Sequence, residues 1–391
     1  MNIRLVYRTL SIGLALSSLS ALGQSNTSSF ELPGFTFERL KNYISADLFY
    51  THDFVSNTGG VKAGPRNIGA LDIYIESDLS KYSDLQGEFM AHYIHINQND
   101  SRASIGDAQG ASNIDMPTQI DRVVDLWYQQ NWNDKTKTLF GIHDISMEFN
   151  VSESSLSFLN ASFGTSAELA LAGPSLYPIT SLGTRTQHSF TDELSIKTGL
   201  YDANVGDEKT YRSFHSDVGN NVGYMHISEL AHQQDDQKIA LAGWNFTKSQ
   251  EKLGANGQAN SYGTYGLYEK KFGHNTWAFA RYGWANPLVS AIQSNISTGV
   301  VYRGILQRKK TNDEVGIGLS QVHFSRQHLK NMQVEENSST SAQETAYETY
   351  YQFKPMRILS LRPDVQYITN PSGINNLKNA WAVGLRTVVE L

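Results

Sequence analysis

Apolar and polar side chains alternate over two strand-length segments at the C-terminal end, within residues 358–391. In the last segment Trp381, Val383 and Leu385 share one parity, whereas Gly384 and Arg386 share the other. Successive side chains of a strand point to opposite faces, so one face of this strand is apolar and the other is small or charged. The pattern is typical of a strand between lipid and water, and a soluble β-sandwich could also show it.

The same alternation recurs from Tyr43 onward in about sixteen segments. In one of them, Leu71 and Ile73 oppose Asp72 and Glu76. No run of about 18 apolar residues follows the N-terminal region, so membrane-spanning helices are excluded. The predicted strands are 43–52, 67–78, 85–96, 119–132, 137–147, 182–190, 194–202, 221–232, 237–247, 262–272, 275–285, 295–304, 313–325, 344–354, 357–369 and 379–391.

The connections between the segments alternate in length. Those after odd-numbered segments are long, and those after even-numbered segments are short, such as Gly273-His274 and Pro355-Met356. An even strand count with alternating long and short connections is typical of a transmembrane barrel. The sequence therefore predicts an all-β fold, a transmembrane antiparallel β-barrel of about 16 strands whose last strand pairs with its first.

The longest connection, 150–181, has helix signals of its own. Leu156, Leu159 and Phe163 recur at helical spacing and predict a helix over 153–163. Ser166 is placed to cap a second helix over 167–172, which the Gly173-Pro174 pair would end. Because a loop this long in a compact protein is usually functional, we expect it to fold into the lumen and narrow it. The alternative is an external loop that packs on its neighbours.

Aromatic residues gather near the segment ends. Tyrosine and tryptophan bury a ring and keep a polar tip in water, so these positions suit the girdles at membrane interfaces. An aromatic-rich soluble core is the alternative. The aromatic residues at these ends are Tyr43, Tyr50, Trp132, Phe190, Phe272, Trp277, Trp284, Phe353, Tyr367 and Trp381.

Residues 1–23 are expected to be a secretory signal peptide. Arg4 and Arg8 precede an apolar stretch, which ends in the small-x-small site Ala21-Leu22-Gly23. We expect a periplasmic lead-in over 24–42 and the barrel over 43–391. Removing the signal takes away two arginines and no acidic residue, which changes the net charge from −6 to −8. This balance argues against nucleic acid as a partner, and the chain has no cysteine for disulfide or thiolate chemistry.

Signatures of catalysis and metal binding are missing from the sequence. His92 and His95 lie three residues apart on one strand, hence on opposite faces, and do not suit a shared metal. The remaining histidines are expected in girdles or loops. The chain has neither a Gly-x-Ser-x-Gly elbow nor a P-loop. We therefore expect no enzyme, no metal and no cofactor; a barrel-embedded lipid hydrolase is the least favoured alternative.

Charged side chains of the polar parity are expected to line the lumen, because a charge that faces lipid costs about 2–4 kcal/mol near the midplane. A solute site in such a pore combines planar polar groups with an aromatic face. Trp127 shares the face of Asp125, and Arg122, whose parity is opposite, needs a bulge or a position near the rim to join them. The predicted pore-lining or substrate residues are Arg122, Asp125, Trp127, Arg185, Glu76, Arg303 and Arg386.

Several motifs, in order along nearly all of the chain after the signal, resemble the carbohydrate-selective porins of Gram-negative outer membranes, the OprB family. The resemblance implies a sixteen-stranded barrel that passes mono- and small oligosaccharides by diffusion. It leaves open whether the chain works as a monomer or as a homotrimer. The matching stretches are Gly59 to Gly64, Gly106 to Ile114, Asp125 to Gln130, Phe158 to Gly164, Tyr177-Pro178 and Arg362 to Pro371.

The chain also departs from this family. Its N-terminal Gly-Asp-Trp-Gly-Gly type of motif is absent, the last residue is Leu391 instead of an aromatic, and Asp125 and Gln129 stand where glutamates are common. These departures bear on selectivity and leave the barrel prediction intact. A general-diffusion channel and a structural or adhesive outer-membrane barrel are the other readings of the same pattern.

Overall fold

The computed structural model describes residues 44–81, 84–98, 104–205, 223–305, 313–335 and 339–391. The predicted signal peptide (1–23) and lead-in (24–42) lie outside the described residues. Among those that are described, no helix is long and apolar enough to cross a bilayer.

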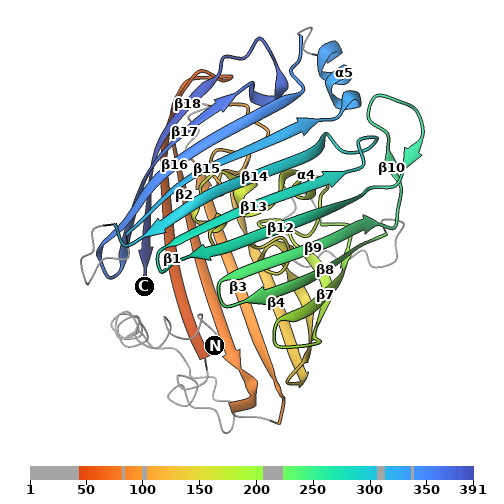
Figure 1. Ribbon diagram of the computed structural model, residues 1–391, viewed down its shortest axis with the longest axis vertical. Coiled ribbons are helices and arrows are strands. Elements are labelled where there is room, and N and C mark those ends of the chain that lie inside the picture. Colours follow the sequence, from red (N-terminus) through yellow and green to blue (C-terminus); the bar gives the residue numbers. More distant parts are fainter. Residues whose placement is uncertain (1–43, 82–83, 99–103, 206–222, 306–312, 336–338) are drawn as a thin grey trace, which may run out of the picture.

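Sixteen antiparallel strands form a closed barrel in which each strand pairs with its neighbours along the chain and β18 pairs with β1 (Figure 1). A hairpin of two short strands, β10 (Gln250–Glu251) and β11 (Gln258–Ala259), stands apart from the barrel. The barrel strands are β1 (Ile44–Thr58), β2 (Gly64–Asp78), β3 (Gly87–Gln98), β4 (Ile120–Asn133), β5 (Thr136–His143), β6 (Ser181–Ser189), β7 (Leu194–Asp202), β8 (Tyr224–Gln234), β9 (Gln237–Phe246), β12 (Tyr262–Phe272), β13 (Thr276–Ala285), β14 (Ile292–Arg303), β15 (Glu314–Phe324), β16 (Gln343–Met356), β17 (Leu359–Thr369) and β18 (Ala380–Glu390).

Each of the sixteen predicted segments corresponds to one strand of the barrel. The first connection, however, was expected to be long and is only 59–63, because β1 and β2 both extend beyond their predicted ends. Gly59 and Gly60 adopt φ of 78° and 69°, a region that glycine enters without steric cost. The paired glycines therefore allow a tight turn where the length rule predicts a loop.

The two faces of the wall differ as the alternation predicts. On the outer face Leu241 is 63% exposed and Ile317 is 67% exposed, whereas the neighbouring Ala240 is buried. Closure leaves no unpaired sheet edge in the barrel, so its backbone groups can pair within the hydrocarbon layer. The outside is therefore suited to lipid, and the polar side chains gather inside.

Aromatic side chains at the strand ends mostly follow the girdle prediction. Trp132, Phe272 and Trp381 are exposed on the outer face. Trp277 is the exception, because it shares the inward parity of Arg281 on β13 and the Arg303 guanidinium lies 4.4 Å from its ring centre. Its assignment to a girdle was wrong.

The helices are short and lie in the connections. The predicted helix over 153–163 was wrong, because residues 158–160 between two short turns are extended: the N–H groups of Leu159 and Asn160 donate to Glu348 on the wall instead of to a helix. Ser166 does stand at the N-cap position of the next helix, but its side chain makes no capping hydrogen bond and donates to Glu168 instead. The helical elements are η2 (Leu79–Lys81), η3 (Ile145–Met147), η4 (Ser155–Ser157), α3 (Ala161–Gly164), α4 (Ala167–Ala170), α5 (Arg326–Glu335) and η5 (Pro371–Gly373).

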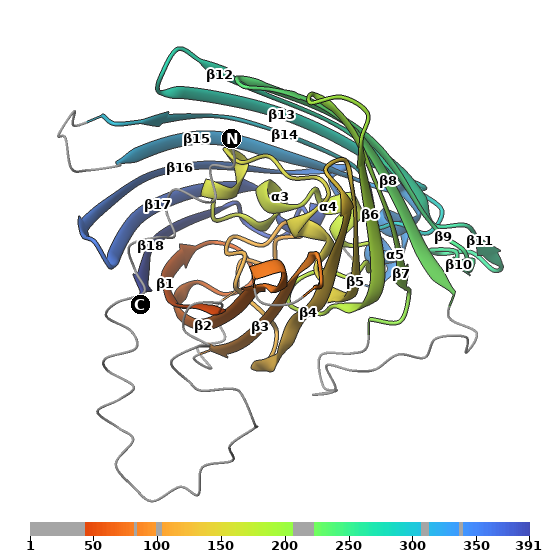
Figure 2. The same ribbon diagram turned by 90° about the horizontal axis from the view of Figure 1, so that it is seen from below.

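The connection 144–180 lies inside the barrel. Figure 2 shows α3 and α4 within the ring of strands. α4 contacts both β13 and β14, on the far side of the ring from the β5 and β6 strands that the connection joins. The prediction that this loop folds into the lumen is therefore confirmed.

An ion pair spans the seam where the barrel closes. Asp53 on β1 lies directly opposite Arg386 on β18. The Arg386 guanidinium donates from Nε to Oδ1 at 2.7 Å and from Nη2 to Oδ2 at 2.6 Å. Because Asp53 is fully buried and Arg386 is nearly so, each charge depends on the other for its solvation.

We expect Arg386→Met to destabilise the barrel by about 3–5 kcal/mol, because it leaves the Asp53 carboxylate buried and unpaired. Samples in SDS are heated to a series of temperatures before electrophoresis, and the temperature at which the folded band disappears measures this loss. The double variant Asp53→Asn, Arg386→Met should regain most of the stability. Equal melting temperatures for wild type and the single variant would contradict a stabilising role for this pair.

Candidate functional site in the barrel lumen

Carboxylates of the inner wall accept hydrogen bonds from the backbone of the lumenal loop 144–180. Glu269 on β12 accepts from Ser154 N at 2.7 Å and from Glu153 N at 3.1 Å. Glu348 on β16 accepts from the next part of the loop at 2.6 and 2.9 Å, as described above. These side chains come from different parts of the ring, so the loop is held along its length.

Cationic side chains of the wall satisfy the carbonyl groups of the same loop. Arg281 on β13 donates from Nη2 to Ser162 O at 2.6 Å and to Phe163 O at 2.9 Å. Its Nη1 donates to Asn150 O at 2.9 Å and to Gly164 O at 3.2 Å. A single guanidinium thus serves four carbonyls. Three further basic residues each donate to one loop carbonyl: Lys197 to Glu148, Lys238 to Val151 and Arg362 to Ser157.

Aromatic packing fixes the loop where the hydrogen bonds hold it. The rings of Phe158 and Phe163 stack at 4.4 Å and meet Phe279 and Tyr350 of the wall edge-on. All four side chains are buried. Apolar burial thus adds to the polar contacts and makes the loop a fixed part of the pore.

One wall of the lumen carries a histidine between two carboxylates. His92 on β3 lies 2.9 Å from Asp72 and 3.1 Å from Asp125, and its ring stacks on Tyr74 at 3.9 Å. The other oxygen of Asp125 accepts the N–H of Asp144 at the start of the loop. Burial and the neighbouring Asp125 raise the pKa of Asp144 to about 6. This network ties the first residue of the loop to β3 and β4.

A charged cluster follows on the same wall. Arg185 on β6 donates to Glu148 Oε1 at 2.6 Å and to Gln129 at 3.0 Å, and Lys197 on β7 lies 3.3 Å from Glu148. Burial alone would raise the pKa of Glu148, but Lys197 and Arg185 lower it to about 2. Glu148 is therefore charged at physiological pH, held between two cations of the wall.

All seven predicted pore-lining residues face inward, but they lie on different parts of the barrel wall and do not form one site. Asp125, Trp127 and Arg185 share one wall, where Gln129 links the β4 row to Arg185. Arg122 joins this inner face through a register shift between β3 and β4, a bulge of the kind that was one of the two predicted possibilities. Glu76 lies on β2, whereas Arg303 and Arg386 lie elsewhere on the ring and pair with Glu314 and Asp53.

Several residues that hold the loop were not among those predicted from the sequence. Arg281 and Glu269 share the inward parity of their strands, so parity could have found them. Glu148 lies beyond a strand end and gave no such signal. His143, expected in a girdle or loop, is buried on β5 and lies 2.6 Å from the Tyr201 hydroxyl. Among the residues described here, no group of acidic or histidine side chains suits a metal ion.

Comparison with known proteins gives one family. The profile of the carbohydrate-selective porin, OprB family, matches residues 62–391. Porin B of Pseudomonas aeruginosa is 24% identical over 310 residues, and a putative porin, QuiX, of Acinetobacter baylyi is 23% identical over 318 residues; each alignment covers 68% of both chains. The high-pH structure of Pseudomonas putida OprB matches with a TM-score of 0.79 at 17% identity, over 90% of this chain and 96% of that one.

We expect Arg281→Met to loosen the lumenal loop, because four carbonyl groups lose their donor. In planar bilayers the variant should show a higher mean conductance and frequent transient steps. Tyr282→Phe, on the outer face of the same strand, is the matched control and should behave like wild type. A quiet, unchanged conductance in the Arg281 variant would show that the loop is held by other contacts.

The packing of the loop should also depend on pH. Burial raises the pKa of Glu168 on α4 to about 7, although the Ser166 hydroxyl opposes this shift. The packed state therefore favours the protonated acid. Its contribution is full below the ordinary glutamate pKa of about 4.3 and is lost as pH rises through about 7.

Transient steps in the current should accordingly become more frequent as pH rises from 5 to 8. Glu168→Gln should flatten this dependence, whereas Glu153→Gln, exposed on the same loop, should retain it. Parallel pH profiles for wild type and the Glu168 variant would contradict the assignment.

Proposed function

This chain belongs to the carbohydrate-selective porin family and forms a passive outer-membrane channel for carbohydrates, a channel rather than an enzyme; we propose that its solute passes along the wall of β4 to β7 and stacks on Trp127. The observation that carries this proposal is the inward position of Trp127 on the same wall as a charged cluster in which Glu148 and Lys197 remain partly exposed. Gly141 lies opposite Trp127 on β5 and has no side chain to cover the indole. The indole supplies an apolar surface for the C–H face of a sugar ring.

The polar partners that water can reach differ from those first expected. The Glu148 and Lys197 side chains are 19% and 23% exposed, whereas that of Arg185 is 2% exposed. Asp125 is buried and occupied by His92 and by the loop. We assign Trp127, Glu148 and Lys197 to direct contact with sugar, and Asp125 and Arg185 to positioning them.

Release must be easy in a passive channel, so only a few such contacts are expected. A charge-assisted hydrogen bond contributes about 1.5–3 kcal/mol, and the entropy cost of immobilising the solute offsets much of what one or two such bonds and a stacked ring contribute, so we expect an affinity of about millimolar. This weak binding is compatible with rapid passage of mono- and small oligosaccharides.

We also propose that the protein assembles as a homotrimer, the arrangement that the family resemblance leaves open. The apolar outer wall, with residues such as Leu241 and Ile317, suits a neighbouring barrel as well as lipid. Native mass spectrometry of the detergent-solubilised protein distinguishes one copy from three, and a mass of a single chain would overturn this part of the proposal.

Sugar block of the ion current tests the solute site. Trp127→Ala should lower the apparent sugar affinity about tenfold, because the stacking surface is lost, while salt conductance stays the same or rises. Arg185→Ala removes a cation from the lumen and loosens Glu148, so the reversal potential should shift toward cation selectivity. If neither variant changes sugar block, the solute site lies on another wall, near Glu76, Arg303 or Arg386.

A further inference from the structure

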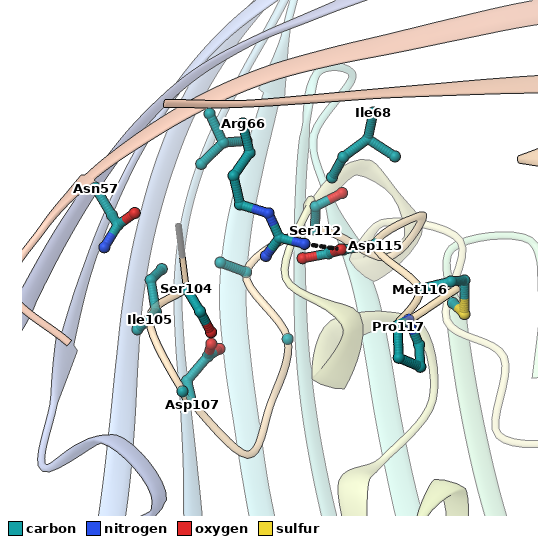
Figure 3. Close-up of a pocket in the computed structure, with 14 residues that line it drawn as sticks. Asn57, Arg66, Ile68, Ser104, Ile105, Asp107, Ser112, Asp115, Met116 and Pro117 are labelled. Atoms are coloured by element: carbon teal, nitrogen blue, oxygen red, sulfur yellow. Dashed lines mark hydrogen bonds and ion pairs between the residues drawn. The ribbon is translucent and has the colours of Figure 1, made fainter. Parts of the chain in front are cut away.

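A cavity lies on the long-loop side of the lumen, away from the Trp127 wall. It is enclosed by the adjoining ends of β1 and β2 and by residues 104–117 of the connection between β3 and β4 (Figure 3). Its volume is about 310 Å³. This is at the lower end for small-molecule sites, which span about 300–1,000 Å³, and it suits one sugar ring rather than an oligosaccharide.

The lining of the cavity divides into an apolar part and a polar part. Ile68, Ile105, Met116 and Pro117 supply the apolar surface. Figure 3 shows the Arg66 side chain reaching from β2 toward Asp115, and the two groups form an ion pair of 2.5 Å. Both side chains remain about a quarter exposed, at 23% and 24%. A pyranose ring presents the same division, with C–H groups on its faces and hydroxyls at its edge.

One carboxylate oxygen of a lining residue has no partner in the part of the chain that the structure describes. Asp107 Oδ2 is buried and has no hydrogen-bond partner among the described residues. A buried oxygen without a donor is costly, and a sugar hydroxyl is the kind of donor that would satisfy it. Arg66 offers further N–H groups beyond the one that binds Asp115, because a guanidinium carries five.

The walls of the cavity are held in place without a ligand. Ser104 and Lys62 exchange two backbone hydrogen bonds of 2.9 Å, and the Ser372 hydroxyl donates to Gly106 O at 2.7 Å. On the other side, the Ser112 hydroxyl donates to Asp53 at the barrel seam at 2.7 Å. A solute therefore enters a preformed site and pays little for ordering the loop.

We propose that this cavity is a second solute site, which captures a single neutral sugar ring through Asp107 and Arg66 on the loop side of the lumen. The inference rests on the proposed function in that the solute is a carbohydrate, but it involves none of the residues assigned to the Trp127 site. Capture at this position would raise the local concentration of sugar above the narrow part of the channel.

Two experiments test the inference. The first is isothermal titration calorimetry of glucose binding to the whole protein in detergent. The second measures how glucose, added on the long-loop side, blocks the ion current. Asp107→Asn removes the unpaired charged acceptor, and Ala111→Leu fills the cavity without changing a charge. Each should weaken one class of glucose binding about tenfold and leave the Trp127-dependent class in place. Asp134→Asn, in the exposed turn at the other end of β4, is the matched control and should not change either class.

The outcomes separate the two proposals. If Trp127→Ala weakens glucose binding and both cavity variants bind like wild type, the cavity inference is overturned and the proposed function stands. If the cavity variants alone weaken binding, the cavity is a solute site and the Trp127 wall is not. Unheated SDS gels confirm that each variant is folded, and Ala111→Leu keeps the test decisive if Asp107→Asn does not fold.

Discussion

A loop that lies inside a barrel needs hydrogen-bond partners that its own short helices cannot supply. In this protein the inner wall supplies both the acceptors and the donors. Carboxylates such as Glu269 and Glu348 accept from loop N–H groups, and Arg281 donates to four loop carbonyls. The position of the loop follows from this matching, and the shape of the solute path follows from the position of the loop.

The same matching explains why few wall charges remain for solute. Asp53 and Arg386 hold the seam, and Asp125 anchors the start of the loop. Buried ionic groups of this kind maintain a geometry and are strongly destabilising when one partner is removed. The side chains left partly exposed, such as Trp127 and Lys197, are then the ones that a passing sugar can meet.

Strand parity predicted most of the barrel because a wall between lipid and water imposes a strict period of two. It also predicted that Arg122 needed either a bulge or a position near the rim, and the register shift between β3 and β4 is such a bulge. The helical spacing of apolar residues, in contrast, failed where contacts distant in sequence dominate. Residues 153–163 have helical spacing, yet the carboxylate of Glu348 binds their N–H groups and keeps the chain extended between η4 and α3.

The site was less predictable than the wall because its contacts join residues that are distant in the sequence. Inward parity identifies a lumenal side chain, but the partner across the lumen depends on contacts distant in sequence. Arg185 pairs with Glu148, and Asp107 lines a cavity with Arg66, through loops that carry no periodic signal. The sequence could therefore name lumenal residues without distinguishing those that bind the loop from those that face water.

The central claim is that the solute path runs past the loop inside the lumen, and cysteine labelling tests it most directly. The chain has no cysteine, so single introduced thiols report one position each. Leu156→Cys lies on the loop with a 51% exposed side chain, whereas Leu241→Cys faces outward. A charged methanethiosulfonate reagent should reduce the current of the first variant, with protection by sugar, and leave the second unchanged. Modification of Leu156→Cys with no change in current would contradict the account.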